Sequence, residues 1–336
     1  MNRTVCGPRA LLLTLAFLAT GLTGSPRVEA QETEAAGQTA AANVGQGRAV
    51  LITGASSGIG LRTAEVLAAN GFYVYAGARK QADLDALNAI DNIEAIRLDV
   101  NVQEEIDAAV ARVQAGGRGL YGLINNAGVL VMEPLIEVSE EDLAFQMNVN
   151  VFGPYRVTRA FAPLLIESQG RVATTGSISG IGTWGLGGPY TMSKHAIEAY
   201  TDVLAIELAA LGVKVAVVEP GNYQSEIMES MVERMREAGY APEGSMAQDR
   251  MERVLSGPAD RAQFKEPDEV AAAYLDFLTS DSPKRRYMVV PNQNEAEFTI
   301  RALIRRLVQL NEGQPYAYTR DELMAMIDEA VAEEAN

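Results

Sequence analysis

Residues 49–60 read AVLITGASSGIG: four apolar residues, a glycine-rich turn and the first residues of a helical pattern. The apolar residues 49–52 predict a buried strand, because a strand covered on both faces shows no alternation with polar residues. Gly54, Gly58 and Gly60 let the backbone turn sharply and come close to a pyrophosphate group. The N-terminus of the following helix would supply free N–H groups and the positive end of a dipole. This stretch therefore predicts a strand, a phosphate-binding turn and a helix in succession.

The same succession of an apolar run and a helical pattern continues along the chain. The predicted strands are residues 49–52, 73–76, 95–98, 122–124, 171–174 and 213–218. The predicted helices include residues 60–70, 81–88, 102–114 and 190–211. Strands without polar alternation, separated by helices, indicate a parallel sheet covered on both faces. We therefore expect one doubly wound α/β domain over residues 48–311, without a second domain boundary.

Composition excludes several functions. The chain has 336 residues, is 48% hydrophobic, and carries a formal net charge of −16. A chain this acidic would repel phosphate groups. We therefore expect no binding to nucleic acid through general electrostatics. Cys6 is the single cysteine and His195 the single histidine. A Cys/His metal site, a cysteine nucleophile or an internal disulfide therefore cannot be built, and we expect no metal site.

The first thirty residues differ from the rest of the chain. Residues 10–22 form an apolar run preceded by Arg3 and Arg9, and residues 28–30 offer a small-x-small cleavage site. We expect residues 1–30 to be a signal peptide that exports the protein to the periplasm or out of the cell. The alternative is an uncleaved membrane anchor through residues 10–22. Residues 31–47 are predicted to be a flexible linker.

Two later stretches depart from the strand–helix rhythm. Residues 222–266 are rich in Met, Glu and Arg and form an insert after the sixth predicted strand. Residues 312–336 end in an acidic helical pattern with Leu323, Met326 and Val331 on one side. The expectation for this tail is a helix that packs on the domain or on a partner subunit.

Several motifs follow the glycine loop in a set order. They are NNAG at residues 125–128, VNVFG at residues 149–153, Ser177, YTMSK at residues 190–194, and Pro220-Gly221. Together with the loop, whose spacing is GxxxGxG, they resemble the short-chain dehydrogenase/reductase family over about residues 48–291. The resemblance implies a Rossmann-type fold, an NAD(P)-dependent oxidoreductase, and a homodimer or homotetramer to which the helix 190–211 contributes.

The YxxxK pair carries the expected chemistry. A free tyrosine titrates near ~10, too high for an efficient base at neutral pH. Lys194 lies one helical turn beyond Tyr190, so its ammonium, with the oxidised nicotinamide, would lower that pKa. Tyr190 is therefore the predicted general acid/base, and Ser177 would orient the substrate oxygen. By resemblance, Lys194 also holds the nicotinamide ribose and Asn150 helps to hold a water in the proton path. His195 points away from Lys194 and is interpreted as a packed or surface residue.

The residues after the second predicted strand select the cofactor. An acid there would favour NAD, whereas this chain has Arg79 and Lys80, which favour NADP. The alternative is that both simply begin an exposed helix. The resemblance assigns the cofactor to Gly54, Ser56, Ser57, Gly58, Ile59, Gly60, Arg79, Asp99, Val100, Asn126, Ala127, Gly128, Tyr190, Lys194, Pro220 and Gly221. Asp99 has a second interpretation, as a local cap.

The substrate region is expected after Ser177 and in the insert. Large apolar residues there indicate an adaptable apolar pocket or, alternatively, core: Trp184, Leu186, Met192, Tyr223, Met228 and Met231. We assign the substrate to Ser177, Trp184, Tyr190, Tyr223 and Met228. The insert and residues 284–290 resemble the hydroxysteroid and retinol dehydrogenase members, which implies a bulky, apolar secondary alcohol or ketone. Two alternatives remain open: a catalytically silent NADP(H)-binding regulator or scaffold, and an epimerase or dehydratase acting on nucleotide sugars.

Overall fold

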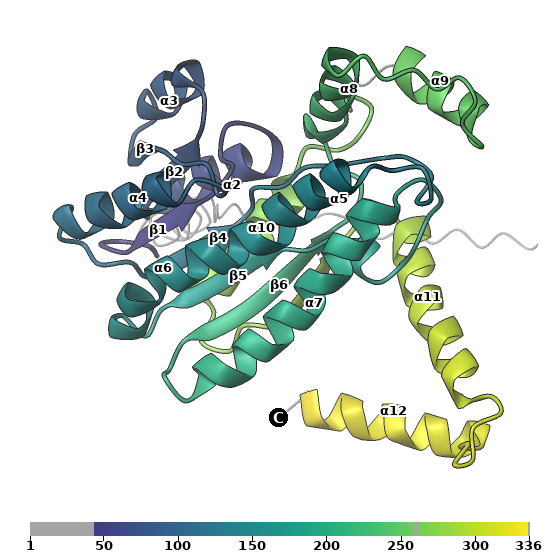
Figure 1. Ribbon diagram of the computed structural model, residues 1–336. Coiled ribbons are helices and arrows are strands. Elements are labelled where there is room, and N and C mark those ends of the chain that lie inside the picture. Colours follow the sequence, from purple (N-terminus) through teal and green to yellow (C-terminus); the bar gives the residue numbers. More distant parts are fainter. Residues whose placement is uncertain (1–43, 258–260, 335–336) are drawn as a thin grey trace, which may run out of the picture. The chain divides into compact units, whose positions relative to one another are not determined.

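Seven parallel strands form one sheet in the order β3-β2-β1-β4-β5-β6-β7 in the computed structural model, which describes residues 44–257 and 261–334 (Figure 1). The strands are β1 (Ala49–Ile52), β2 (Tyr73–Ala78), β3 (Ile93–Arg97), β4 (Gly122–Asn125), β5 (Arg171–Thr175), β6 (Lys214–Pro220) and β7 (Arg286–Val289). The predicted signal peptide or anchor of residues 1–30, with Cys6, lies outside the described residues, as do residues 31–43 of the predicted linker. Among the described residues, no helix is long and apolar enough to cross a membrane.

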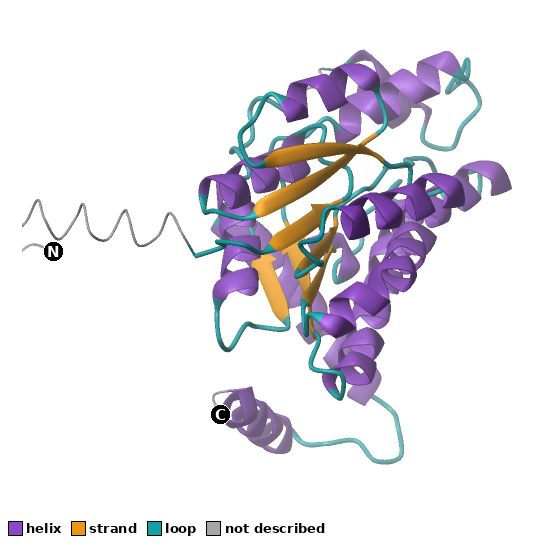
Figure 2. Ribbon diagram, turned by 90° about the vertical axis from the view of Figure 1, so that its left-hand side faces the viewer, coloured by secondary structure: helices purple, strands orange, loops and turns teal. Residues whose placement is uncertain are grey.

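Helices connect the strands and cover both faces of the sheet (Figure 2). They are α2 (Gly58–Ala69), α3 (Gln81–Asn88), α4 (Gln103–Ala115), α5 (Glu140–Met147), α6 (Gly153–Glu167), α7 (Gly188–Ala209), α8 (Ile227–Glu237), α9 (Gln248–Ser256), α10 (Asp268–Thr279), α11 (Gln293–Asn311) and α12 (Arg320–Glu334). A π-helical turn, Asn148–Phe152, joins α5 to α6, and a 3-10 turn, Ile178–Gly180, follows β5. The prediction of a doubly wound α/β fold is confirmed.

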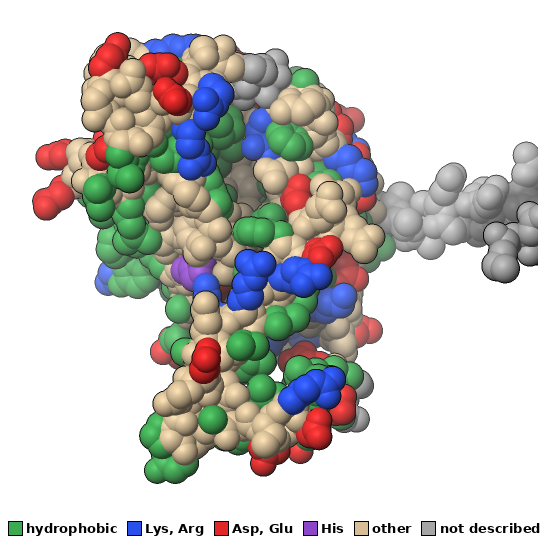
Figure 3. Space-filling view, turned by 90° about the vertical axis from the view of Figure 1, so that its right-hand side faces the viewer, with side chains coloured by type: hydrophobic (Ala, Val, Ile, Leu, Met, Phe, Trp, Pro, Cys, Tyr) green, Lys and Arg blue, Asp and Glu red, His purple; other side chains and the backbone are tan. Residues whose placement is uncertain are grey.

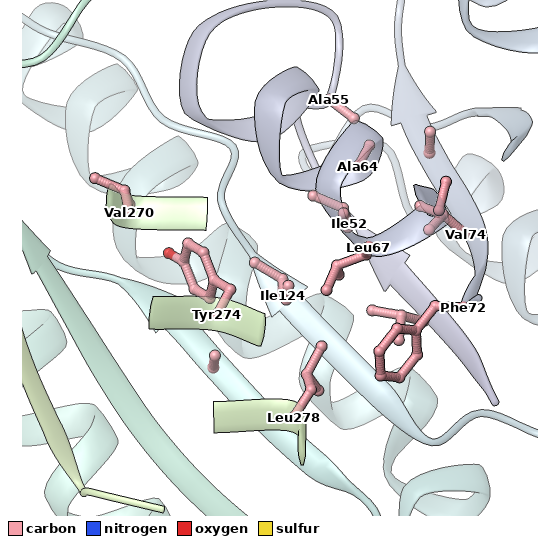
Figure 4. Close-up of a cluster of buried hydrophobic side chains, with 14 of the residues drawn as sticks. Ile52, Ala55, Ala64, Leu67, Phe72, Val74, Ile124, Val270, Tyr274 and Leu278 are labelled. Carbon is pink, nitrogen blue, oxygen red and sulfur yellow. The ribbon is translucent and has the colours of Figure 1, made fainter. Parts of the chain in front are cut away.

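Alternate residues of β1 point into two different hydrophobic cores. Val50 and Ile52 pack with α2, α3 and α10, whereas Ala49 and Leu51 pack with α4, α6 and α7. Figure 4 shows part of the first core, with Leu67 of α2, Ile124 of β4 and Leu278 of α10 among its buried side chains. The residues of β1 are therefore apolar whichever face they point to, which explains this unbroken apolar run in the sequence.

Five of the six predicted strands differ from the prediction by one or two residues at an end, and a seventh strand was not predicted. The third strand, expected at residues 95–98, spans Ile93–Arg97, because it pairs with β2 from Ile93 onward, directly after Asn92 turns the chain with a positive φ of 63°. The strand β7 was not predicted. Its four residues pair with β6 at the sheet edge, and three of them are exposed or only partly buried, although residues 287–290 form the apolar run YMVV.

The insert of residues 222–266 leaves and rejoins the sheet at one narrow neck. Tyr223 and Lys265 form a parallel bridge, and the N–H of Gln224 donates to the oxygen of Lys265 at 2.9 Å. Beyond this neck, α8 and α9 bury a methionine-rich cluster against the segment after β4. Its fully or largely buried members are Leu130, Leu186, Met231, Val232, Met235 and Met251. The insert therefore has a small core of its own.

The last two helices bury little of their surface in this chain. Thr299 is the buried residue of α11, and the described part of α12 has no buried residue. The expectation that the acidic tail packs on its own domain is therefore wrong for the described residues, and packing on a partner subunit stays a prediction.

Candidate active site

One cavity of about 960 Å³ lies at the carboxyl ends of the central strands. Gly54 follows β1, Asn126 follows β4, Ser177 follows β5 and Gly221 follows β6, and all of them line it. In a doubly wound sheet this is the edge at which ligands bind, where the strand order reverses between β1 and β4. Figure 3 shows a hollow on one face of the molecule with hydrophobic and basic side chains at its rim. Of the predicted site residues, Asn150 is the exception that does not line the cavity.

The glycine loop is clamped against the segment that follows β4. Gly54 has a φ of +64°, and a Cβ at this position would lie 2.7 Å from the Cα of Ala127. The side-chain nitrogen of Asn126 donates to the backbone oxygens of Thr53, at 3.1 Å, and Gly54, at 2.9 Å. Because the side-chain amide of Asn126 donates to the loop, its contribution to cofactor binding would be to hold the loop in shape.

The first turn of α2 fits a pyrophosphate. A Cβ on Gly60 would lie 2.2 Å from the oxygen of Gly54, so only glycine lets the helix start this close to the loop. The helix begins at Gly58, and the N-cap residue Ser57 makes no side-chain capping bond. The first turn lines the cavity, and its N–H groups lack intrahelical partners. These residues would hold the diphosphate of a dinucleotide.

The other end of the cavity is basic. Arg79 and Lys80 line it beside Asp99, and the Nη1 of Arg79 lies 3.8 Å from the Oδ2 of Asp99. The Arg79 side chain is 63% exposed, so this ion pair is weak and the guanidinium is free to turn toward a phosphate. Asp99 also accepts the N–H of Asn101 at 2.9 Å, which is the local cap considered in the sequence analysis.

Three of the four residues of the expected catalytic set, Ser177, Tyr190 and Lys194, line the cavity together. Ser177 follows β5, and its Oγ accepts the N–H of Ser179 at 3.0 Å. Tyr190 and Lys194 project from the first turns of α7. The Nζ of Lys194 donates to the oxygen of Thr175 at 2.7 Å and lies 5.5 Å from the centroid of the Tyr190 ring.

Burial shifts the pKa values of both ionisable members. Burial raises the pKa of Tyr190, and a hydrogen bond to Ser177 and the charge of Arg261 lower it in part. Burial lowers the pKa of Lys194 to about 8, while the carboxylate of Glu198 raises it. Lys194, which was expected to lower the pKa of Tyr190, is not among these groups, and the expected effect of the oxidised nicotinamide stays a prediction.

Asn150 lies behind the cavity wall, in the π-helical turn. Its Nδ2 donates to the oxygen of Val129 and to the Oγ of Ser193, and its Oδ1 accepts the N–H of Val129 at 2.8 Å. The side chain therefore fixes the segment after β4 to α7. Its role in a proton path stays a prediction.

A pair of buried carboxyl groups lies one turn beyond Lys194. Glu198 and Glu219 share Arg286 of β7, which also binds Asp202 at 2.6 Å. Burial, together with the neighbouring Glu219, raises the pKa of Glu198 to about 8. Burial also raises the pKa of Glu219. The pair therefore holds a proton at neutral pH.

The substrate end of the cavity is only partly as expected. Trp184, Tyr223 and Met228 line it, and the indole of Trp184 donates to the Oγ of Ser179 at 3.1 Å. Met231, also considered for the pocket, is buried in the core of the insert and does not line it. Met192 is exposed on α7.

Several cavity residues were missed. Arg234 and Arg261 of the insert and Glu295 and Phe298 of α11 all line it. The sequence offered no local signal for them, because an insert rich in Arg and Glu looks like a solvated surface. The single histidine, His195, does not line the cavity. Its ring nitrogens form hydrogen bonds with the backbone oxygen of Thr191 and with the guanidinium of Arg306, in keeping with its interpretation as a packed or surface residue.

The fold and the site define a dinucleotide-dependent oxidoreductase, and comparisons with known proteins agree. The family described as short chain dehydrogenase matches residues 48–236. YbbO of Escherichia coli strain K12, an uncharacterized oxidoreductase, is 32% identical over 245 residues, which cover 72% of this chain and 85% of YbbO. Human 17-beta-hydroxysteroid dehydrogenase type 6 is 36% identical over 200 residues, 57% of this chain and 63% of that enzyme.

A solved structure shows the same similarity. The crystal structure of a short-chain dehydrogenase/reductase from Burkholderia phymatum in complex with NAD matches with a TM-score of 0.66 and 26% identity, over 82% of this chain and 99% of that one. This chain therefore belongs to the short-chain dehydrogenase/reductase family and is an NAD(P)-dependent oxidoreductase.

Proposed function

We propose that this protein interconverts a bulky, apolar secondary alcohol and its ketone with NADP(H), and that Tyr190 is the general acid/base. The observation that supports this most is the convergence of Ser177, Tyr190 and Lys194 in the cavity that the glycine loop also lines. When bound, the nicotinamide would supply or accept the hydride.

Side chains of this protein transfer the proton in the proposed reaction. In the direction of reduction, the hydroxyl of Tyr190 donates its proton to the carbonyl oxygen, while the Oγ of Ser177 donates a hydrogen bond to the same oxygen. In the direction of oxidation, the tyrosinate takes the hydroxyl proton of the alcohol. The hydrogen bond to Ser177 favours that tyrosinate, because it lowers the pKa of the Tyr190 hydroxyl.

The preference for NADP rests on Arg79 and Lys80. Both line the basic end of the cavity, where a 2′-phosphate would lie, and Arg79 is held only by a weak, exposed ion pair. Asp99, just after β3, would instead favour NAD, because its carboxylate could bind a ribose hydroxyl.

An apolar substrate is supported by the lining of the cavity. Trp184, Met228 and Phe298 surround the substrate end, and methionine and aromatic side chains adapt to bulky apolar ligands. The similar human enzyme, by its name, acts on hydroxysteroids. We assign this chain the same broad class of substrate, without naming the compound.

The test is a fluorescence titration of the purified protein with NADPH and NADH, followed by turnover assays on steroid, retinoid and aliphatic ketones. We expect tighter binding of NADPH than of NADH and reduction of at least one bulky ketone. Binding of NADPH without turnover of any ketone or alcohol would favour the silent regulator instead. Absence of binding to either cofactor would contradict the proposal.

Two further expectations belong to the same proposal. Exposed apolar side chains on α6 and α7, among them Tyr155, Val203 and Ile206, support association of two or more copies, which light scattering would measure. We also propose that residues 1–30 export the protein or anchor it in a membrane. Fractionation of expressing cells, with N-terminal sequencing of the product, distinguishes cleavage from anchorage.

A further inference from the structure

The cavity contains a cation that transfers no proton in the proposed reaction. Arg261 comes from the closing end of the insert and lines the cavity together with Ser177 and Tyr190. It is half-buried, and burial lowers the pKa of its guanidinium. Reduction of a simple ketone needs a proton donor and a hydrogen-bond donor, which Tyr190 and Ser177 already provide. A further charge in this space therefore needs another explanation.

Arg261 is held rigidly, yet part of its donor capacity is unused. Its Nε donates to the backbone oxygen of Tyr223 at 2.9 Å, and its Nη2 donates to the Oδ1 of Asn222 at 2.9 Å. Its Cζ lies 4.3 Å from the ring centroid of Phe264. A guanidinium has five N–H groups. Among the described residues, the Nη1 group has no hydrogen-bond acceptor.

The nearest carboxylate is already engaged. Glu295 raises the pKa of Arg261 through its charge, but its oxygens accept the N–H of Asn222 at 2.8 Å and the Nδ2 of Asn292 at 3.0 Å. Within the described residues, no carboxylate lies within 4.0 Å of Arg261 as an ion pair. A half-buried guanidinium without such a partner attracts an anion, and its fork matches the two oxygens of a carboxylate.

The position of Arg261 points to the substrate end of the cavity. Its charge acts on Tyr190, where it lowers the pKa of the hydroxyl. The phosphate-binding turn at Gly58 has its own N–H donors, and the basic residues Arg79 and Lys80 serve the opposite end. An anion bound by Arg261 would therefore lie near the atoms that react.

We propose that Arg261 binds a carboxylate of the substrate, so that this oxidoreductase acts on apolar alcohols or ketones that also carry an acid group. The inference rests on the proposed function and refines its substrate from a purely apolar compound to an apolar hydroxy or oxo acid. The alternative source of the anion is the diphosphate of the cofactor. A third explanation is that Arg261 only latches Asn222 and Tyr223 over the cavity.

The test is calorimetric titration of the full chain, loaded with NADP, with 4-phenylbutyrate and with 4-phenylbutanamide, which has the same apolar body without the charge. We expect the acid to bind at least about tenfold more tightly than the amide. Arg261→Gln should abolish this preference. Arg261→Lys, which keeps the charge but loses the fork, should retain part of it. The matched control is Arg236→Gln, because Arg236 belongs to the same insert and lies outside the cavity lining.

Three outcomes would overturn the proposal. One is equal binding of acid and amide, or no binding of either, by the wild type. Another is a preference that survives in Arg261→Gln. The third is a loss of NADPH affinity in Arg261→Gln as large as the loss for the acid, which would assign the anion to the cofactor or make Arg261 a latch. If wild-type protein binds no NADPH, the proposed function fails, and the same titrations without cofactor still decide the role of Arg261.

Discussion

Lys194 donates a hydrogen bond from its Nζ to the backbone oxygen of Thr175 at 2.7 Å, and this bond joins α7 to the end of β5. Thr175 lies two residues before Ser177, so the same bond sets the separation between the serine and the helix that carries Tyr190. A buried ammonium needs an acceptor, and a backbone oxygen provides one without neutralising the charge. Lys194 can therefore keep its charge beside the tyrosine ring.

Replacing Tyr190 by Phe removes the proposed proton donor while keeping the ring. We expect kcat to fall at least about 100-fold, because general acid–base catalysis contributes factors of this size. The dissociation constant of NADPH should stay within about twofold. Steady-state kinetics and fluorescence titration measure the two quantities. Tyr200→Phe, on the same helix, is the control and should keep the wild-type rate. A Tyr190→Phe enzyme with more than a few per cent of that rate would show that another group transfers the proton.

Exchanging Arg79 for Asp should reverse the choice of cofactor. A carboxylate at this position repels a 2′-phosphate and accepts hydrogen bonds from a ribose hydroxyl. We expect the ratio of the NADPH and NADH dissociation constants to shift at least about tenfold toward NADH. Arg159→Asp, an exposed change on α6, controls for the altered net charge. An unchanged ratio in Arg79→Asp would show that Arg79 does not select the cofactor.

The buried pair Glu198 and Glu219 should make stability depend on pH. The folded chain keeps a proton on Glu198 up to about pH 8, whereas the unfolded chain releases it near pH 4.5. The free energy of unfolding should therefore fall as the pH rises from about 4.5 to about 8. Above pH 8, the folded chain loses the proton of Lys194 before the unfolded chain does, which raises the free energy of unfolding as the pH rises. The other charged groups around the pair are Arg286 and Asp202.

Thermal unfolding at pH 6 and pH 8 tests this dependence. The Tm of the wild type should fall over this interval, and the Tm of Glu198→Gln should fall less, because glutamine does not titrate. Glu167→Gln, an exposed change on α6, should behave like the wild type. A Tm that falls equally in wild type and Glu198→Gln would mean that other groups carry the pH dependence.

A hydroxyl of α10 supports the same end of β5. The Oη of Tyr274 lies 2.6 Å from the Oγ1 of Thr175, and both groups are largely buried. Tyr274→Phe should lower the free energy of unfolding by about 1–2 kcal/mol, because the partly buried hydroxyl of Thr175 loses a hydrogen-bond partner. Urea unfolding measures the change. Tyr155→Phe, on an exposed tyrosine, should change it by less than about 0.5 kcal/mol, and equal effects of the two would refute the argument.

The sequence predicted the parts of the site that are local. The turn from Gly54 to Gly60 and the pair Tyr190 and Lys194 each depend on residues within one or two helical turns, and backbone geometry fixes how they face. The buried strands of the sheet centre were predicted for a similar reason, because an apolar run needs cover on both faces wherever it lies.

The remaining features depend on contacts between distant residues. Glu219 meets Glu198 only because β6 passes beside α7, and nothing near either residue indicates a shared proton. Arg261 enters the cavity because the insert returns to its own beginning, although its sequence resembles a solvated surface. The effect of burial on Tyr190 was missed for the same reason: the spacing of the helix shows its neighbour Lys194, but not the walls that surround both side chains.

The neck formed by Tyr223 and Lys265 makes the insert a segment that can be replaced without changing the rest of the fold. Its two ends are already joined by backbone pairing, so lengthening or shortening the segment between them changes the closure entropy only slowly. The residues proposed to hold the cofactor and to move the proton lie outside this segment, apart from those at its neck. Substrate range can therefore diversify by replacement of one contiguous stretch of the gene, while the sheet, the glycine loop and the tyrosine helix stay as they are.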